Sequence, residues 1–169
     1  MLLETALPVV VSGTAKFMDL CWMRVDNGWI LLSLGVGFVC RCLLYKTAGI
    51  AEFAAGAVLP LLILGVLFYF RMLGAGDIKL FCALGGIMGV AEIIQCMLYS
   101  FLLGGIFSLG ILILWGDFRE RMRYFFQYFQ EFFSTGKVKP YLKPGMTSEN
   151  FHFTVPVFLS VLLYAGGWY

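Results

Sequence analysis

The sequence predicts an all-α polytopic membrane protein of about six helices, and three observations lead to this fold class. Of the 169 residues, 61% are hydrophobic and only 13% are charged, and the mean hydropathy is +0.90. In soluble domains about a quarter of all residues are charged, so this composition indicates a lipid environment. The apolar residues also form separate runs, each near the length of about 20 residues that a membrane-spanning helix needs. Because lipid offers the backbone no hydrogen-bond partner, each run is expected to be helical.

The six runs follow one another with short connections, except before the last. They cover residues 2–18, 29–45, 50–70, 78–90, 93–115 and 153–169. The fourth run is short for a complete span and contains glycine. We expect residues 1–169 to form one integral-membrane domain, with residues 117–152 as a cytoplasmic connection between the fifth and sixth helices.

The connection over residues 117–152 contains an amphipathic stretch. Apolar side chains recur there at helical spacing, with arginine and glutamine on the other faces: Phe118, Met122, Phe125, Phe129 and Phe132. This pattern is typical of a helix that lies in the membrane interface with its apolar face in the lipid. Either a plain connector or a segment that guides a substrate fits the pattern.

The basic residues indicate how the bundle is oriented. If the connection after the first helix is cytoplasmic, only Arg41 and Lys46 of the 12 Lys and Arg residues fall on the opposite side. An excess of basic residues marks the cytoplasmic side of a membrane protein. We therefore expect a multi-pass protein of the cytoplasmic membrane with its N-terminus outside.

Two aspartates stand at the ends of apolar runs on the predicted cytoplasmic side. Asp19 closes the first run and Asp77 opens the fourth, and two crossings separate them, so they share a side in either orientation. An ionisable group at the edge of the hydrocarbon costs free energy and is a functional candidate by default. Two neighbouring carboxyl groups can share one proton, so that one activates a water molecule while the other polarises a carbonyl group. The single histidine, His152, is expected in a loop without a catalytic role.

The residues around Asp77 add to this hypothesis. Gly74 and Gly76 precede it, and glycine permits unusual backbone conformations and close approach of another chain. The same glycines can equally serve to break and cap a helix. Lys79 can tune Asp77 or hold a lipid phosphate, or it can simply extend toward the membrane surface. Asn27 is expected to stabilise the turn that follows the first helix.

Two motifs resemble a known family. The sequence GAGDIKL at residues 74–80, followed by ALGG at 83–86, is similar to the signature of the type IV prepilin peptidases, membrane aspartyl proteases of the GxGD class. The family's first aspartate lies in a pattern close to D-L-R-x-R-x-I-P-N, and Asp19, Leu20 and Asn27 match it. Cys21 departs from the pattern, as does Asp26, which stands where proline is usual. The six-helix plan extends the resemblance over nearly the whole chain.

The resemblance implies an enzyme that removes the short N-terminal leader from prepilins or pilin-like precursors at the cytoplasmic face. It assigns catalysis to Asp19 and Asp77, with supporting roles for Gly74, Gly76, Lys79 and Asn27. It implies no metal, no organic cofactor and no nucleic-acid partner; the expected partners are the precursor and the lipid bilayer. The chain lacks the paired C-x-x-C motifs of the methylating members, so it is similar to the short, peptidase-only form of Tad/Flp pilus systems.

Three other interpretations stay open. Asp26 is a rival for the role of first aspartate, although the register of the motif favours Asp19. The chain can be a catalytically inactive scaffold of a pilus or secretion system. A small ion- or proton-coupled transporter is also possible, although the predicted helix centres are nearly free of charge.

Overall fold

The computed structural model describes residues 2–70, 72–114, 123, 126–127, 130 and 152–169. Within this part of the chain it contains no strand and five α-helices: α1 (Leu2–Trp22), α2 (Asn27–Tyr69), α3 (Ala75–Met88), α4 (Val90–Leu114) and α6 (Thr154–Ala165). The all-α fold class is therefore confirmed. The interfacial helix expected between residues 117 and 152 lies almost entirely outside the described residues.

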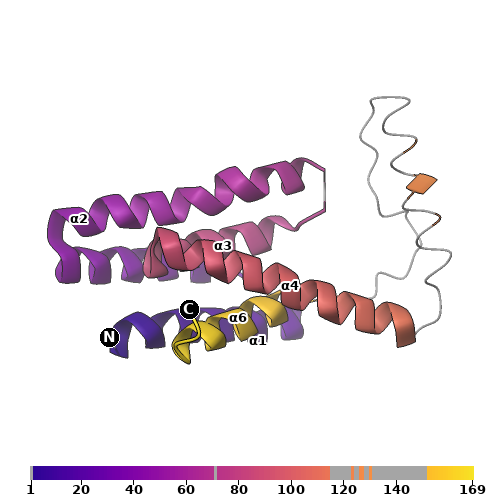
Figure 1. The fold of residues 1–169 in the computed structure, drawn as a ribbon. Helices are drawn as coiled ribbons and strands as arrows, with labels where there is room; N and C mark the ends of the chain where they lie inside the picture. The colour runs from indigo at the N-terminus through magenta and orange to yellow at the C-terminus, as the bar shows by residue number, and fades with distance from the viewer. Residues whose placement is uncertain (1, 71, 115–122, 124–125, 128–129, 131–151) are drawn as a thin grey trace.

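Helix α2 is a helical hairpin rather than one straight rod. Lys46 has φ 54° and ψ −131°, values that no α-helix accommodates, and Figure 1 shows the chain folding back on itself at this point. The two halves correspond to the runs predicted at 29–45 and 50–70. The break expected between these runs is confirmed, and one non-helical residue is enough to make it.

Three predicted helix boundaries are wrong by several residues. Helix α1 continues to Trp22, so Asp19 lies within its last turns instead of closing it. Helix α3 begins at Ala75, so Asp77 lies inside its first turn. The last helix ends at Ala165 rather than at residue 169. Helix ends depend on capping and tertiary contacts, which an apolar run does not reveal.

Helix α3 is the centre of the bundle. Nine of its residues are buried, from Ile78 to Met88, and it packs against α1, α2 and α4. Its backbone touches that of α2, because a Cβ atom built on Gly85 would lie 2.1 Å from the carbonyl oxygen of Gly56. Such contacts between small residues are a common way for helices to associate in membranes. Helix α6 packs beside α1 and α4 (Figure 1).

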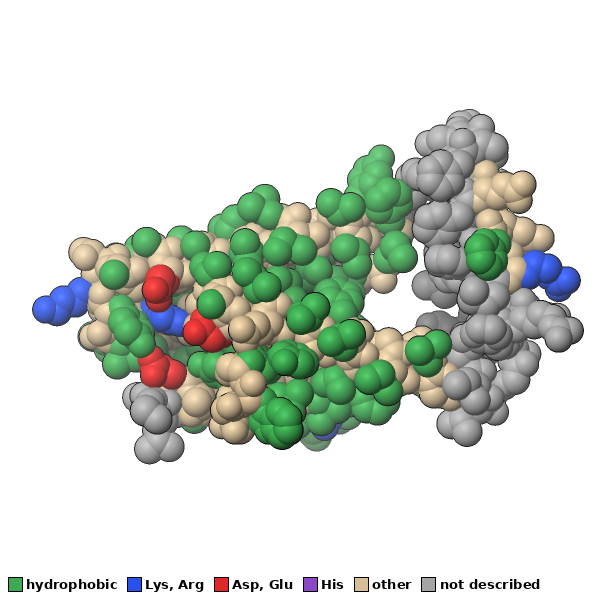
Figure 2. Space-filling view, viewed as in Figure 1, with side chains coloured by type: hydrophobic (Ala, Val, Ile, Leu, Met, Phe, Trp, Pro, Cys, Tyr) green, Lys and Arg blue, Asp and Glu red, His purple; other side chains and the backbone are tan. Residues whose placement is uncertain are grey.

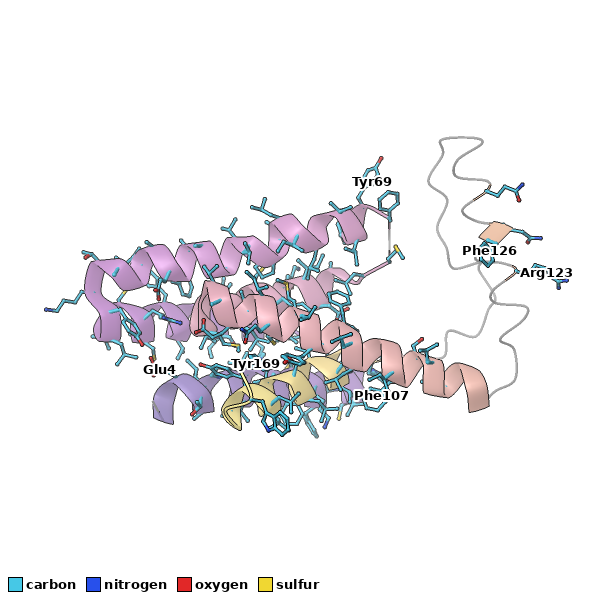
Figure 3. The ribbon with its side chains drawn as sticks, viewed as in Figure 1. Glu4, Tyr69, Phe107, Arg123, Phe126 and Tyr169 are labelled. Carbon is cyan, nitrogen blue, oxygen red and sulfur yellow. The ribbon has the colours of Figure 1, made fainter. Side chains whose placement is uncertain are left out.

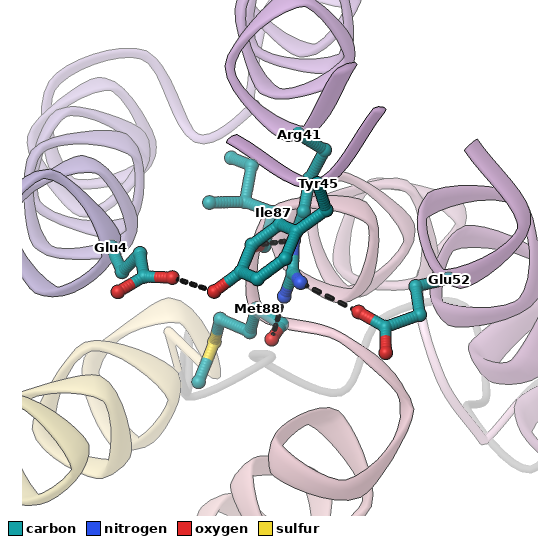
Figure 4. Close-up of polar contacts among 6 residues, drawn as sticks. All are labelled: Glu4, Arg41, Tyr45, Glu52, Ile87 and Met88. Atoms are coloured by element: carbon teal, nitrogen blue, oxygen red, sulfur yellow. Dashed lines mark hydrogen bonds and ion pairs between the residues drawn. The ribbon is translucent and has the colours of Figure 1, made fainter. Parts of the chain in front are cut away.

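Arg41 fixes the C-terminal end of α3. Its guanidinium group donates to the carbonyl oxygens of Ile87, at 3.0 Å, and of Met88, and it forms an ion pair of 2.8 Å with Glu52 (Figure 4). The Arg41 residue is only 9% exposed. One buried side chain therefore satisfies carbonyl groups that a helix end leaves without intrahelical partners, and it ties α3 to both halves of α2.

The outer surface of the bundle fits a membrane protein. Helix α2 and residues Val90–Ile111 of α4 are long and apolar enough to cross a bilayer by length and composition. Leu31, Leu43 and Leu62 are 73%, 78% and 68% exposed, and Figure 2 shows apolar side chains covering the middle of one face. Soluble monomers rarely expose continuous apolar patches of this kind. The six-span topology and its orientation stay predictions.

Candidate active site

Asp19 lies near the C-terminal end of α1 and contacts the segment that leads into α6. The hydroxyl group of Thr154 donates to Asp19 Oδ2 at 2.7 Å, and Nδ1 of His152 lies 3.0 Å from the same oxygen. The side chain of Asp19 is 16% exposed and that of His152 22%. This carboxyl group is therefore held between α1 and the start of α6 at a largely desolvated position.

Asp77 occupies the third position of α3, and this position explains its conformation. The N-cap residue Gly74 has an extended backbone (φ −73°, ψ 146°), and its N–H group donates to the carboxylate of Asp77. A side chain that reaches back from the third helical position to the N-cap N–H is one half of a capping box. The N-terminal end of the helix dipole also favours an acidic side chain here.

The structure corrects the conformational reason given for the two glycines. Neither Gly74 nor Gly76 has a positive φ, so no unusual backbone conformation requires them. A Cβ atom on Gly74 would lie 3.1 Å from Oδ2 of Asp77, so this glycine leaves room for the aspartate itself. Gly76 faces open space, because a Cβ atom added to it would have no other atom within 4 Å. Room for a substrate strand at Gly76 stays a prediction.

The two aspartates act on each other electrostatically. The negative charge of Asp19 acts on the Asp77 carboxyl group, which is also largely buried and accepts the Gly74 N–H bond. Desolvation and a neighbouring like charge both disfavour an ionised carboxylate. Among the described carboxylates, it is Asp19 and not Asp26 whose charge has this effect on Asp77. Two side chains from distant parts of the sequence are therefore near enough for the charge of one to affect the other.

Lys79 and Asn27 contact each other. Lys79 Nζ donates to Asn27 Oδ1 at 2.8 Å, which links the first turns of α3 and α2. Both residues are exposed, so we expect this bond to contribute well under about 1.5 kcal/mol to stability. The contact supports a structural role for both residues near Asp77, whereas a direct role of Lys79 in tuning Asp77 stays a prediction.

Asp26 lies in the short connection between α1 and α2, where it is the N-cap of α2. Its side chain makes no capping hydrogen bond and its backbone has φ −68° and ψ 136°. This φ is the value that a proline ring imposes, which explains how aspartate can stand where the related motif has proline. Asp26 also lines an open depression of about 510 Å³ together with Met18, Trp22 and Arg24.

His152 and Thr154 are the site residues that the sequence analysis missed. His152 was expected to lie in a loop without a role, but the structure places it against Asp19. A signal was present in the sequence, because both residues open the last apolar run on the same predicted side as Asp19. The described residues contain no cluster of three or more His, Cys, Asp or Glu side chains that could hold a metal ion.

These features define an all-α protein with an apolar surface and two interacting carboxyl groups at one end of its helices. Residues 7–109, more than half of the chain, match the model of the type IV leader peptidase family, and the chain belongs to this family. Its membership identifies it as a peptidase, and the resemblance found in the sequence is confirmed. The matched range contains both Asp19 and Asp77. Comparisons with curated proteins and with solved structures gave no match.

Proposed function

We propose that the protein is a membrane aspartyl endopeptidase that removes the N-terminal leader from type IV prepilins or pilin-like precursors at the cytoplasmic face. The observation that supports this proposal is that Asp19 and Asp77 lie at the same end of the bundle and that the charge of Asp19 acts on Asp77. A leader peptidase needs one group to activate water and another to protonate a carbonyl oxygen, and a coupled carboxyl pair provides both.

The reaction balances with one proton shared by the pair. The ionised carboxylate removes a proton from water, whose oxygen attacks the carbonyl carbon of the scissile peptide, while the protonated carboxyl group gives its proton to the carbonyl oxygen. In the resulting tetrahedral diol the C–N bond breaks. The first carboxyl group then protonates the leaving nitrogen, and a diol hydroxyl returns a proton to the second. Both aspartates end in their starting states.

The position of the pair fits a substrate cut next to a membrane helix. Asp19 and Asp77 lie at the end of the bundle where α1 ends and α3 begins, away from the fold of α2 at Lys46. Figure 3 shows Glu4 near that fold and Tyr69 at the opposite end of α2. The apolar outer surface beside the site would accommodate the hydrophobic helix of a precursor, with its leader extending to the side that is rich in basic residues.

Cleavage of a co-expressed prepilin tests the proposal. Wild type, Asp19→Asn, Asp77→Asn and the matched control Asp26→Asn are compared by the gel shift of the substrate, with membrane levels of each variant measured in parallel. We expect Asp19→Asn and Asp77→Asn to abolish cleavage and Asp26→Asn to retain it. Loss of cleavage in Asp26→Asn together with Asp77→Asn, but not in Asp19→Asn, would mean that the pair is assigned wrongly. Equal cleavage by all four proteins, or none across a panel of prepilins, would favour the scaffold or transporter interpretation.

A further inference from the structure

Asp19 and Asp77 are in different surroundings, and the difference lies in the side chains that contact them. Two side chains contact Oδ2 of Asp19, the Thr154 hydroxyl at 2.7 Å and the His152 ring at 3.0 Å. Asp77 instead accepts one backbone N–H, that of Gly74. Hydrogen bonds donated to a carboxylate favour its ionised form.

Of the two side chains that contact Asp19, Thr154 is the more deeply buried. Thr154 is only 1% exposed, so its hydrogen bond to Asp19 is shielded from water and strengthened by the low local dielectric. Thr154 is the first residue of α6, directly after the N-cap residue Phe153. Its hydroxyl donates to Asp19, and the contact places the Asp19 carboxylate at the N-terminus of α6, where the helix dipole favours a negative charge.

Other charged groups near this end of α1 have partners of their own. The ammonium group of Lys16 lies 4.6 Å from the ring centre of Phe158, and Lys79 donates to Asn27. Asp26 and Arg24 line the open depression in the connection between α1 and α2. Of the ionisable groups in the described part of the chain, His152 contacts Asp19 directly and Asp77 is affected by its charge.

We propose that Thr154 and His152 are positioning residues that hold Asp19 in its ionised form, so that Asp19 is the general base and Asp77 the general acid. This inference rests on the proposed function and adds to it the direction of proton transfer. Asp19 removes the proton from water and later gives it to the leaving nitrogen. Asp77 gives its proton to the carbonyl oxygen and regains one from the diol.

The pH dependence of kcat/KM for cleavage of a purified prepilin tests this assignment. The rate falls at low pH when the carboxylate that acts as the base becomes protonated; this is the acid limb of the profile. It falls at high pH when the carboxyl group that acts as the acid loses its proton; this is the alkaline limb. Thr154→Val keeps the shape of the side chain but removes the donor. We expect it to move the acid limb upward by about one to two pH units and to lower kcat, with KM unchanged. His152→Leu should move the same limb, and Thr154→Ser should restore the wild-type profile.

Ser160→Ala is the matched control. Ser160 is a buried hydroxyl residue on the same helix, and it donates to the carbonyl oxygen of Cys96 at 2.9 Å rather than to Asp19. Its loss should lower stability without moving either limb. If Thr154→Val and His152→Leu move the alkaline limb instead, the roles of the two aspartates are reversed. If neither variant moves any limb, Thr154 and His152 do not position Asp19.

A second measurement separates failure of this inference from failure of the proposed function. In the Asp77→Asn background Asp19 titrates without its partner, and infrared difference spectra against the Asp19→Asn, Asp77→Asn double variant isolate its carboxyl band. Adding Thr154→Val should move the midpoint of this titration upward. This result requires no cleavage, so an unmoved midpoint overturns the inference even when cleavage is normal, and a moved midpoint supports the positioning role even when no prepilin is cut.

Discussion

Replacing Gly85 by alanine tests the backbone contact between α2 and α3. The added Cβ atom would lie 2.1 Å from the carbonyl oxygen of Gly56, whereas real contacts of this kind essentially never fall below 3.0 Å. The two helices must therefore move apart by about 1 Å, a gap that removes roughly a quarter to a half of the dispersion attraction between facing atoms. Overpacking typically costs about 1–3 kcal/mol, and we expect Gly85→Ala to reach the upper end because backbone cannot rotate away.

The assay is thermal unfolding in detergent, followed by size-exclusion chromatography of the heated protein. For a chain of this size about 3 kcal/mol corresponds to a fall in Tm of roughly 6–12 °C. Gly65→Ala is the matched control. Gly65 lies in α2, as does Gly56, the residue that Gly85 contacts, but a Cβ atom added to Gly65 would have nothing within 4 Å. It should be neutral or slightly stabilising, because alanine favours a helix over glycine by up to about 1 kcal/mol.

The double variant Gly56→Ala, Gly85→Ala sharpens the test. Either substitution alone forces the same two backbones apart, so the second should add much less than the first, with a coupling of at least about 1 kcal/mol. Full additivity would mean that the two residues do not share a contact. A Tm for Gly85→Ala equal to that of Gly65→Ala would refute the close approach of α2 and α3 altogether.

Two further predictions concern charged residues. Asp26→Pro should retain cleavage and stability, because the backbone already has φ −68°. Arg41→Ala should lower stability by about 2–4 kcal/mol, because it leaves two carbonyl groups at the end of α3 and the Glu52 carboxylate without this partner.

Each of these predictions has its own check. For Asp26→Pro, loss of cleavage at normal membrane levels would show that the carboxylate has a role. For Arg41, Arg41→Lys should recover only part of the stability, since an ammonium group cannot reproduce the planar fork of donors; full recovery would show that charge alone matters.

The position of Asp19 and Asp77 at the same end of the bundle could be predicted from the sequence. Asp19 and Asp77 interrupt apolar runs, and counting crossings places them on the same side without any knowledge of packing. The hairpin in α2 was also foreseen, because the apolar pattern weakens around Lys46. Both features follow from whether each residue lies in the apolar layer or at its edge, and the pattern of apolar and charged residues along the sequence indicates this.

The contacts of the site were beyond the reach of the sequence. His152 contacts Asp19 although the two residues are far apart in the sequence. Such a contact leaves no periodic pattern in the sequence from which it could be predicted. The sequence also left the role of Gly74 open between an unusual backbone conformation and the cap of a helix, and the structure shows it as the N-cap of α3. The choice depends on where the side chain of Asp77 points, which the sequence does not reveal. Helix ends such as Ala75 and Trp22 depend on capping contacts that an apolar run does not encode.

The length of α3 has a consequence for the bilayer around the site. With 14 residues the helix is about 21 Å long, whereas the hydrocarbon layer measures about 30 Å. If Arg41 holds the far end of α3 near one boundary of that layer, Asp77 lies several ångströms short of the other. The membrane must then thin beside the enzyme or admit water to the recess, and rates measured in lipids of shorter acyl chains should rise accordingly. A short central helix would thus let a peptide bond next to a hydrophobic segment meet water without leaving the membrane.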